Sequence, residues 1–592
     1  MPPRPRHPVP AAAATAAPSA GGEEREVEWQ LAAPDLGVVR RWLEQHPLWE
    51  DLRIEPRPTQ QLHDVYLDTE DWRLFRAGFA LRLRENEGRI EATLKGIRSA
   101  RNDAADRREI SEPLPKGGIK GLGDATGPVG SRVRDVAGVK PLRPLFEVRN
   151  SRQRFAVRRG NPAADVGEIA LDEARFTRTN GRRRPLVMTR VELEAIGSDS
   201  APLERLAERL HTECGLDPAK ENKFAVGLRA ASLELPWREE PSPKGELAQP
   251  LIDASTRASD FAAAVLQRLL DEWHAHEPAA RLGECPEALH ALRVTVRRVD
   301  TVLCLFGGHL PAAVRKGRPR LKNLLDALGT VRDADIRLEA AARFRDSLPE
   351  GSRRMLDPLL RQLESERGEA RSTMLRALDA KPSRDWLDSL PAELTRTVSR
   401  ATSAPPGTAA ALAIAPGLIR RRYRKLRKRA RRLSPESSLR DYHEVRIRTK
   451  KLRYALEIVA ATYGRPAEEM LAGLHKLQGK LGAQHDAGAV AQYLQRLATR
   501  PPASFAPETL FTLGAMAERH ARKAGRLGGK VEVLWHRVRG KRWKALRSRM
   551  RDLCDDASES NRKQDGPDRG GERSSNLASA SGGSASSEPA RP

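Results

Sequence analysis

The sequence predicts a multidomain protein in which a strand-rich α+β half is followed by an all-helical half. Three observations support this fold class. A chain of 592 residues is too long for a single hydrophobic core. Residues 25–232 alternate apolar and charged residues in short runs, separated by clusters of Gly, Pro, Asn and Asp, which is the pattern of β-strands. Residues 255–550 repeat apolar residues with a period of about 3.6, which indicates helices.

Changes in composition place the boundaries between these segments. The stretch "PWREEPSPKGELAQP" is typical of a linker, and "ATSAPPGTAAALAIAP" divides the helical half into two parts. We expect a disordered N-terminal tail, not a secretion signal, and a C-terminal tail that is too polar to fold. The predicted division is a tail at 1–24, a strand domain at 25–232, a linker at 233–254, helical repeats at about 255–400 and 417–550, and a tail at 551–592.

The net charge of +26 is confined to the helical half. Residues 251–550 hold 58 Lys and Arg against 32 Asp and Glu, whereas the rest of the chain holds 47 of each. Within that half, residues 401–550 hold 33 basic and 10 acidic residues. A field concentrated in this way attracts a polyanion. The alternative is an ordinary solvated basic surface, which explains a mild excess better than this asymmetry.

The cysteines and the hydropathy favour a cytoplasmic chain. The four cysteines (Cys214, Cys285, Cys304 and Cys554) have neither disulfide-type nor metal-type spacing, which fits a reducing compartment. No apolar run approaches 18 residues, so we expect no segment that spans a membrane.

A basic helix is predicted at "HEVRIRTKKLRYAL", residues 443–456. On a helical wheel of about 100° per residue, Arg446, Lys450 and Arg453 fall within roughly 80° of His443, and apolar residues lie on another face. Like charges at these spacings repel one another, so the stripe favours an anion that neutralises it. The alternative is a helix whose Lys and Arg stems cover apolar surface.

This layout occurs twice in the helical half. In "HALRVTVRRVDTVL", residues 290–303, Arg293 and Arg297 stand on the same arc relative to His290, but Asp300 stands where the second copy has Arg453. A downstream element is repeated as well, as "LGTVRDADI" at 328–336 and "LGAQHDAGA" at 481–489. The helical half is therefore predicted to be an internal repeat with a weaker first half-site.

The repeated "H-x-x-R-x-x-x-[RK]-[RK]" helix and the "LG-x-x-x-D" element resemble a CHAD domain, the conserved histidine α-helical domain, over about residues 255–550. The resemblance implies two helical bundles related by pseudo-twofold symmetry, with basic helices lining a shared groove that binds inorganic polyphosphate. The run "RRRYRKLRKRARR" at 420–432 adds a further basic helix. The positions that match are His290, Arg293, Arg297 and Arg298 in the first copy and His443, Arg446, Lys450, Lys451 and Arg453 in the second.

Four short strands in the N-terminal half carry charges at two-residue spacing. Acidic side chains share a face in "EVEWQL" (26–31) and in "VELEA" (191–195), and basic side chains do so in "ALRLRE" (80–85). "EATLKG" (91–96) places Lys95 on a face with polar neighbours. Each strand alone fits a sheet with one wet face. If the sheet closes, carboxylates that suit Mg²⁺ or Mn²⁺ face bases that suit a polyphosphate.

The strand half resembles the CYTH domains, or triphosphate tunnel metalloenzymes. The resemblance rests on "EVEWQ", "VYLDTEDWRLFRAGFALRLR", "TLKG", "GEIALDEARF", "VELEA" and "NKFAVGL", which occur in the expected order. It implies an antiparallel tunnel of eight strands that uses Mg²⁺ or Mn²⁺. The matching metal-site carboxylates are Glu26, Glu28, Glu192 and Glu194, with Glu168 and Asp172 as weaker matches. The phosphate-binding bases that match are Arg82, Arg84, Lys95, Arg154 and Lys223. Glu26, Glu28 and Lys95 are the expected catalytic residues.

One position departs from this family. Its opening motif is Glu-x-Glu-x-Lys, and here Gln30 occupies the lysine position. A glutamine can form hydrogen bonds but brings no charge, so we expect slow hydrolysis that Gln30→Lys accelerates.

Three functions remain open on the sequence. The first is a metal-dependent inorganic triphosphatase that also binds polyphosphate. The second is a non-catalytic protein that binds polyphosphate and associates with polyphosphate granules in the cytoplasm. The third, nucleic-acid binding, is disfavoured because aromatic residues for base stacking make up only 4% of the chain.

Overall fold

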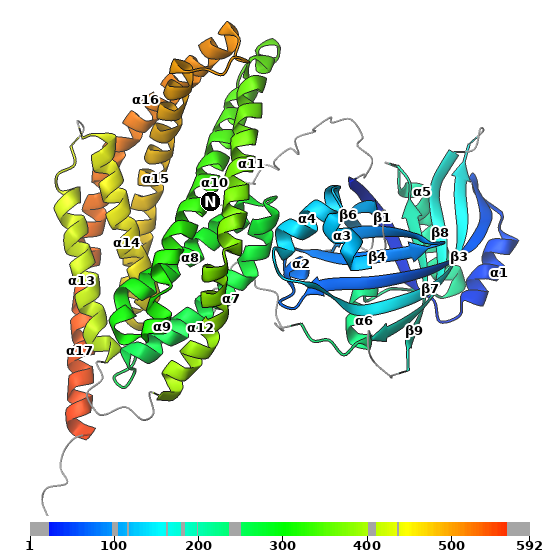
Figure 1. Ribbon diagram of the computed structural model, residues 1–592, viewed down its shortest axis with the longest axis horizontal. Coiled ribbons are helices and arrows are strands. Elements are labelled where there is room, and N and C mark those ends of the chain that lie inside the picture. Colours follow the sequence, from blue (N-terminus) through cyan, green and yellow to red (C-terminus); the bar gives the residue numbers. More distant parts are fainter. Residues whose placement is uncertain are drawn as a thin grey trace, which may run out of the picture. The chain divides into compact units, whose positions relative to one another are not determined.

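The computed structural model describes residues 23–97, 105–114, 118–160, 164–178, 184–197, 199–235, 250–400, 410–434 and 437–564. The chain divides into two compact units. Unit 1 comprises residues 1–248, 263–399 and 484–525, and unit 2 comprises residues 249–262, 400–483 and 526–592. The strand domain and most of the first helical repeat therefore belong to unit 1, and the elements described in unit 2 are helices (Figure 1).

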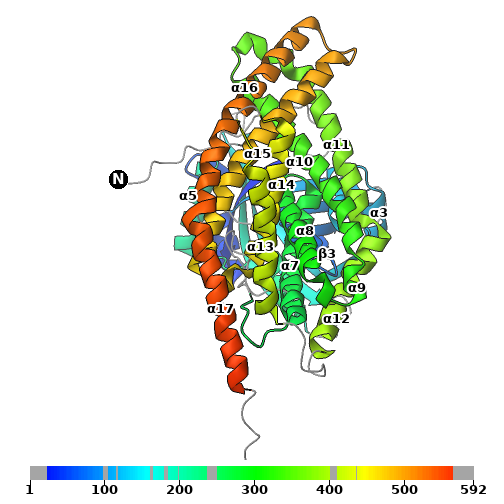
Figure 2. The same cartoon turned by 90° about the vertical axis from the view of Figure 1, so that its left-hand side faces the viewer.

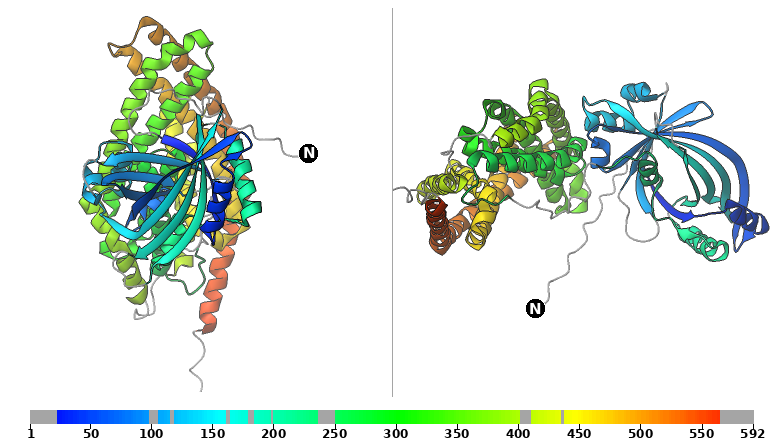
Figure 3. Two further views of the ribbon diagram at one scale, coloured as in Figure 1. Left: turned by 90° about the vertical axis from the view of Figure 1, so that its right-hand side faces the viewer. Right: turned by 90° about the horizontal axis from the view of Figure 1, so that it is seen from below.

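Eight antiparallel strands close into a ring in the strand domain, as the resemblance to the CYTH domains implied (Figure 3). Strand β9 pairs back with β1, which completes the ring. Two short strands, β2 (Leu48–Trp49) and β10 (Asp217–Pro218), pair with β3 and β1 outside it. The order around the ring is β1 (Glu23–Ala32), β6 (Ala105–Leu114), β5 (Arg89–Gly96), β4 (Phe79–Asn86), β3 (Leu52–Thr69), β7 (Leu142–Arg159), β8 (Ala164–Arg178) and β9 (Leu186–Ala195).

The strand register places charged side chains on the inner face of the ring. Glu28 lies opposite Glu194 across the β1–β9 pair. Lys95 lies opposite Glu109 across the β5–β6 pair. Residues directly opposite one another share a face, and every second residue along a strand returns to that face. The alternation that the sequence displays therefore becomes a lumen lined by charges.

Helices cover apolar parts of the outer face. Trp29, Phe155 and Leu193 form one core with the buried sides of α1 (Leu36–Gln45) and α5 (Ala201–Cys214). A second core joins strands β4, β5 and β6 to α3 (Gly118–Asp124) and α4 (Pro128–Ala137). Burying these apolar side chains stabilises the ring at roughly 25 cal/mol per Å² of apolar surface removed from water.

The strand domain also contains two shorter helices, α2 (Arg73–Arg76) and α6 (Lys223–Ala230). Helix α6 packs tightly because Gly227 has no side chain, and a Cβ there would clash with the ring of Phe146. Asn222 caps this helix by accepting a hydrogen bond from the Ala225 backbone N–H at 2.8 Å. This close packing fixes the position of Lys223 at the first turn of the helix.

The helices of the C-terminal half follow the same order twice. The repeated His-x-x-Arg motif lies in α8 and in α14, and the repeated Leu-Gly pairs lie within α10 and α15. Helices α10 and α11 of unit 1 lie side by side (Figure 2). The first set is α7 (Ala258–Leu282), α8 (Pro286–Phe306), α9 (Ala312–Arg315), α10 (Arg318–Asp346), α11 (Asp357–Asp379) and α12 (Lys381–Arg400). The second set is α13 (Ala411–Ala430), α14 (Leu439–Tyr463), α15 (Arg465–Thr499), α16 (Pro507–Arg537) and α17 (Trp543–Gln564).

Two expected boundaries differ from the structure. Helix α13 begins at Ala411, inside the predicted divider, because Ala411, Leu412 and Ala415 are buried. Helix α17 continues to Gln564, past the expected tail boundary at residue 551. Within unit 2, α17 packs on α13, where the rings of Trp543 and Tyr423 stack with their centroids 3.6 Å apart. Residues 1–22 of the expected tail at 1–24, and every residue after Gln564, lie outside the described residues.

Candidate functional site

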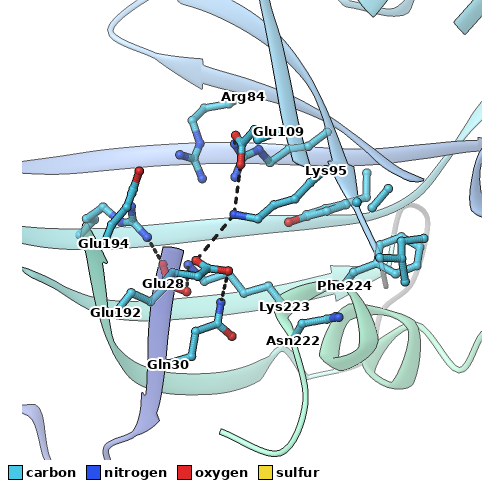
Figure 4. A pocket seen from close by; sticks show the side chains of 16 residues that line it. Glu28, Gln30, Arg84, Lys95, Glu109, Glu192, Glu194, Asn222, Lys223 and Phe224 are labelled. Carbon is cyan, nitrogen blue, oxygen red and sulfur yellow. Dashed lines mark hydrogen bonds and ion pairs between the residues drawn. The ribbon is translucent and has the colours of Figure 1, made fainter. Parts of the chain in front are cut away.

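The lumen of the ring contains a cavity lined by both acidic and basic side chains (Figure 4). Its lining comes from seven of the eight strands and from the start of α6. The basic residues are Arg82, Arg84, Lys95, Arg152 and Lys223, and the acidic residues are Glu28, Glu109, Glu192 and Glu194. Gln30, Tyr66, Asn222 and Phe224 also line it.

Arg82 and Arg84 of β4 form one basic wall. Arg84 binds the carboxylate of Asp64 with two hydrogen bonds of 2.8 Å. Arg84, followed by Arg82 and Lys223, holds the pKa of Asp64 at about 2 against the penalty of its burial. Arg82 Nη2 lies 3.3 Å from Glu109 Oε1. Two guanidinium groups two residues apart on one strand suit the oxygens of neighbouring phosphates.

A second charged cluster lies at the other wall. Lys223 Nζ contacts Asp172 of β8 and lies 3.0 Å from Glu192 Oε1. Arg152 binds Asp172 with two hydrogen bonds of 2.8 Å and also contacts Glu192. Lys223 and Arg152 lower the pKa values of Asp172 and Glu192 although burial opposes this. Both carboxylates are therefore ionised and committed to these bases.

Lys95 lies among three carboxylates. Its Nζ is 3.1 Å from Glu109 Oε2 and 3.7 Å from Glu28 Oε2. Burial raises the pKa of Glu194, and the charges of Glu109 and Glu28 raise it further, while Lys95 opposes them. The repulsion among these three carboxylates is what a divalent cation relieves.

The donor chemistry at this point fits a hard divalent cation. Glu28, Glu109 and Glu194 offer only oxygen atoms, which Mg²⁺ and Mn²⁺ prefer. No group of three or more His, Cys, Asp or Glu side chains within the described ranges is already arranged around a metal position. The ammonium of Lys95 is paired with two of the three carboxylates, Glu109 and Glu28, where a metal ion would otherwise bind. The side chain of Glu26, another predicted ligand, lies outside the described part of β1.

Gln30 forms hydrogen bonds to residues on both sides. Its Nε2 donates to Glu28 Oε1 at 3.0 Å. Its Oε1 accepts a hydrogen bond of 2.8 Å from Nη1 of Arg190, a residue of β9 that is only 4% exposed. The position that lacks the expected lysine is thus joined to a buried arginine.

The structure brings most of the predicted tunnel residues together, with two differences. Arg154 is bound by Glu168 through both carboxylate oxygens and does not belong to the cavity lining. Glu192 and Asp172 are neutralised by Arg152 and Lys223, whereas they were expected near a metal ion.

The sequence reasoning missed Asp64, Glu109, Arg152 and Arg190. Glu109 could have been found, because it alternates with Ser111 on β6 and faces the lumen opposite Lys95. Arg152 could have been found from its alternation with Arg154. Arg190 could have been placed on the inner face from its alternation with Glu192 and Glu194 on β9, but its partner Gln30 could not. Asp64 carries no comparable signal, because its role depends on Arg84 of another strand.

The first basic helix, α8, is packed against neighbours of its own unit. Arg298 Nη1 lies 3.5 Å from Glu272 Oε2 of α7. Arg293 lies over Gly329 of α10, where an added Cβ would meet its Nη2 at 3.6 Å. Asp300 pairs with Arg318 at 2.9 Å, so part of its negative charge is neutralised. His290 is exposed and Arg297 is half-buried.

The second basic helix, α14, belongs to unit 2. Burial lowers the pKa of His443, and the positive charges of Arg446 and Lys450 lower it further. This effect places the three side chains in one electrostatic cluster, and Lys451 is exposed beside them. Each basic helix is described within its own unit, so the shared groove that the resemblance implies remains a prediction.

Arg453 has a different environment from the other bases of α14. The residue is 9% exposed, and its Nη1 lies 3.0 Å from Glu457 Oε1 and 2.8 Å from His475 Nε2. Its guanidinium carbon lies 4.3 Å from the centre of the Tyr454 ring. We predicted Arg453 as part of the anion-binding stripe. Its buried ion pair gives it a structural role in joining α14 to α15.

Comparison with known protein families agrees with this architecture. The model of the CYTH domain matches residues 38–226, and the model of the CHAD domain matches residues 264–495. The chain carries a CYTH domain followed by a CHAD domain. CYTH domains include triphosphatases and cyclases, and those that form metalloenzyme tunnels generally use divalent metals. No helix within the described residues is long and apolar enough to cross a membrane.

Three individual proteins show the extent of the similarity. An uncharacterized protein of Mycobacterium tuberculosis is 29% identical over 527 residues, which cover 81% of this chain and 90% of that protein. A crystal structure of the CHAD domain from Ricinus communis is 25% identical with a TM-score of 0.41, covering 49% of this chain and 95% of that structure. A Hippeastrum protein named as an adenylyl cyclase, and described as having a dominant triphosphatase activity, is 19% identical with a TM-score of 0.27. The match covers 36% of this chain and 100% of the Hippeastrum structure.

Proposed function

We propose that the CYTH domain hydrolyses inorganic triphosphate with the help of a divalent metal ion, and that the CHAD domain binds inorganic polyphosphate. The observation that carries the first part is the cavity, in which five basic and four acidic side chains line one closed ring. A linear triphosphate needs several bases along its length, and its metal ion needs carboxylates beside it. The CYTH lumen offers both.

The bases have separate roles in this proposal. Arg82 and Arg84 hold the phosphate oxygens as planar forks, and Lys95 acts as a point charge. Lys95 Nζ lies 3.7 Å from Glu28 Oε2 and 3.1 Å from Glu109 Oε2. A phosphate that draws Lys95 toward itself releases these two carboxylates, which together with Glu194 would hold Mg²⁺ or Mn²⁺. When bound, such an ion neutralises phosphate oxygens and lowers the pKa of a water molecule. The ring of strands limits access of other water.

The second part of the proposal rests on charge. Helix α13 carries eight Lys and Arg and no acidic residue, and α14 carries the cluster of His443, Arg446 and Lys450. Repulsion among these groups is relieved when a polyanion binds, and the release of counterions favours that binding. A non-catalytic version of the same protein, which only binds polyphosphate and follows it to granules, is the second candidate.

One experiment separates these candidates. The purified full-length chain is mixed with triphosphate, long-chain polyphosphate, ATP or RNA, with and without Mg²⁺ or Mn²⁺, and both binding and phosphate release are measured. We expect metal-dependent release from triphosphate that Glu28→Gln abolishes. Arg446→Ala with Lys450→Ala should leave this release intact and weaken the binding of polyphosphate. Tight binding of triphosphate without any release would favour the non-catalytic candidate.

A further inference from the structure

Three side chains in the tunnel wall, Arg190, Gln30 and Glu28, form a chain of hydrogen bonds that runs from a guanidinium to a carboxylate. Arg190 donates to Gln30 through Nη1, and Gln30 donates to Glu28 through Nε2, at 2.8 and 3.0 Å. The other Nη of Arg190 donates to the backbone carbonyl of Glu221, which holds the guanidinium in place. Arg190 is 4% exposed and Glu28 is 5% exposed, so the two charged groups at the ends of this chain are buried, while Gln30 between them lines the cavity.

The chemistry of the two outer groups sets the orientation of the amide between them. A guanidinium can only donate hydrogen bonds and an ionised carboxylate can only accept them. The Gln30 amide therefore has its oxygen toward Arg190 and its nitrogen toward Glu28. A guanidinium on the amide oxygen also polarises the N–H groups, which strengthens their bond to Glu28. The positive charge of Arg190 thus acts on Glu28 through a neutral side chain.

A lysine in place of Gln30 would not fit this arrangement. An ammonium has three donors and no acceptor, so it removes the oxygen that accepts the hydrogen bond from Arg190 Nη1. It also places two positive charges side by side in a poorly solvated wall, where their repulsion is large. Gln30 and Arg190 therefore suit one another, whereas a lysine at the first position would suit a neutral residue at the second.

We propose that Arg190 is a positioning residue of the tunnel, which holds the Glu28 carboxylate through Gln30 and supplies the positive charge that the missing lysine would bring. This inference rests on the proposed function of the same site. It reverses the expectation from sequence alone, since Gln30→Lys in the natural background should weaken the site.

The test is a double-mutant cycle on the full-length protein with Gln30→Lys, Arg190→Gln and the two combined. Isothermal titration measures the dissociation constants of Mn²⁺ and of triphosphate, and steady-state kinetics give kcat and KM separately. We expect each single substitution to weaken Mn²⁺ binding about tenfold, because each breaks a charge-assisted hydrogen bond. The double variant, in which the cation has moved from position 190 to position 30, should return to within a few-fold of the natural protein. Additive losses in the double variant would overturn the proposal.

A conservative substitution keeps the test decisive if the double variant does not fold. Arg190→Lys retains the charge and a donor for Gln30, so it should keep Mn²⁺ affinity within a few-fold, whereas Arg190→Gln should not. Equal losses from both would contradict the positioning role. The two proposals fail in different ways: a natural protein that binds neither Mn²⁺ nor triphosphate overturns the proposed function and this inference together. A natural protein that binds both but gives an additive cycle overturns the inference alone.

Discussion

Lys95 Nζ lies 3.1 Å from Glu109 Oε2, directly across the β5–β6 pair. A base that the proposed mechanism assigns to phosphate is thus paired with a carboxylate of the tunnel wall. The tunnel neutralises its own charges in this way, which reduces the cost of gathering so many of them in one cavity. The ion pair also means that an anion must compete with Glu109 for Lys95.

This competition gives the first prediction. Glu109→Gln should raise the affinity for triphosphate several-fold in the absence of metal, because it replaces a charged acceptor that competes for Lys95 with a neutral one and so removes a negative charge from the lumen. Lys95→Ala should lower that affinity about tenfold. Isothermal titration with EDTA present measures both. Lys220→Ala, at an exposed position of the same domain, is the control and should change nothing. Unchanged affinity in Glu109→Gln would show that Glu109 does not compete with triphosphate for Lys95.

The second prediction concerns acid stability. Asp64 is 2% exposed, and Arg84 is the main cause that holds its pKa at about 2, below the usual value of 3.8. A carboxyl whose pKa is depressed by folding contributes stability above its unfolded pKa and loses it as the pH falls through the folded value. Its contribution of about 2 kcal/mol should therefore be present at pH 7 and disappear between about pH 4 and pH 2.

Chemical denaturation at a series of pH values checks this. Asp64→Asn should lower the free energy of unfolding at pH 7 and flatten its decline below pH 4. Asp51 forms a solvent-exposed pair with Arg159, so Asp51→Asn is the matched control and should leave both quantities unchanged. An Asp64→Asn protein that keeps the full acid dependence would show that other carboxylates, such as Asp172, carry it.

The third prediction separates the two basic helices. Arg446→Ala with Lys450→Ala should weaken polyphosphate binding by a larger factor than Arg293→Ala with Arg297→Ala. Helix α14 follows the acid-free helix α13, whereas α8 carries Asp300 and pairs with Glu272 of α7. Fluorescence competition at fixed ionic strength measures the two affinities. Arg343→Ala with Lys381→Ala removes two bases from exposed ion pairs and serves as the control. Equal losses from both helices would refute the asymmetry.

Arg453 should behave differently from the bases beside it. Its ion pair with Glu457 is buried, and removing one partner of such a pair costs on the order of 3 kcal/mol. Arg453→Ala should therefore lower the melting temperature of the protein before it affects polyphosphate binding. Arg448→Ala, whose pair with Glu444 is looser and more exposed, should not. If Arg453→Ala has a normal melting temperature but weakened polyphosphate binding, Arg453 belongs to the anion-binding residues of α14.

The spacing of apolar residues and the alternation of charged residues in the sequence were sufficient to predict the strand and helical halves and much of the tunnel lining. The inner faces of β1, β4 and β9 follow from alternation alone, because closing the ring merely brings those faces together. The partners of Asp64 and Arg190 could not be predicted, since the contacts Asp64–Arg84 and Arg190–Gln30 depend on which strands become neighbours. The wheel argument placed Arg453 on the basic stripe because it ignored the facing helix, where His475 binds it. The end of α17 was missed because the residues after Met550 are polar, although they continue the helix to Gln564.

The last prediction concerns the choice among polyanions. The basic helices offer closely spaced charges, while Tyr423, the one aromatic residue in the run 420–432, is buried and stacked on Trp543 and is therefore closed to a nucleotide base. A polyphosphate carries its charges along an unbranched chain without bases, whereas RNA and single-stranded DNA gain much of their affinity from stacking on open aromatic rings. Long-chain polyphosphate should therefore displace labelled RNA at equal phosphate concentration and physiological salt, and the reverse displacement should need a large excess. Both affinities should fall steeply with added salt, because both depend on counterion release. If RNA displaces polyphosphate under these conditions, the basic helices bind nucleic acid, and the polyphosphate proposal for the CHAD domain is wrong.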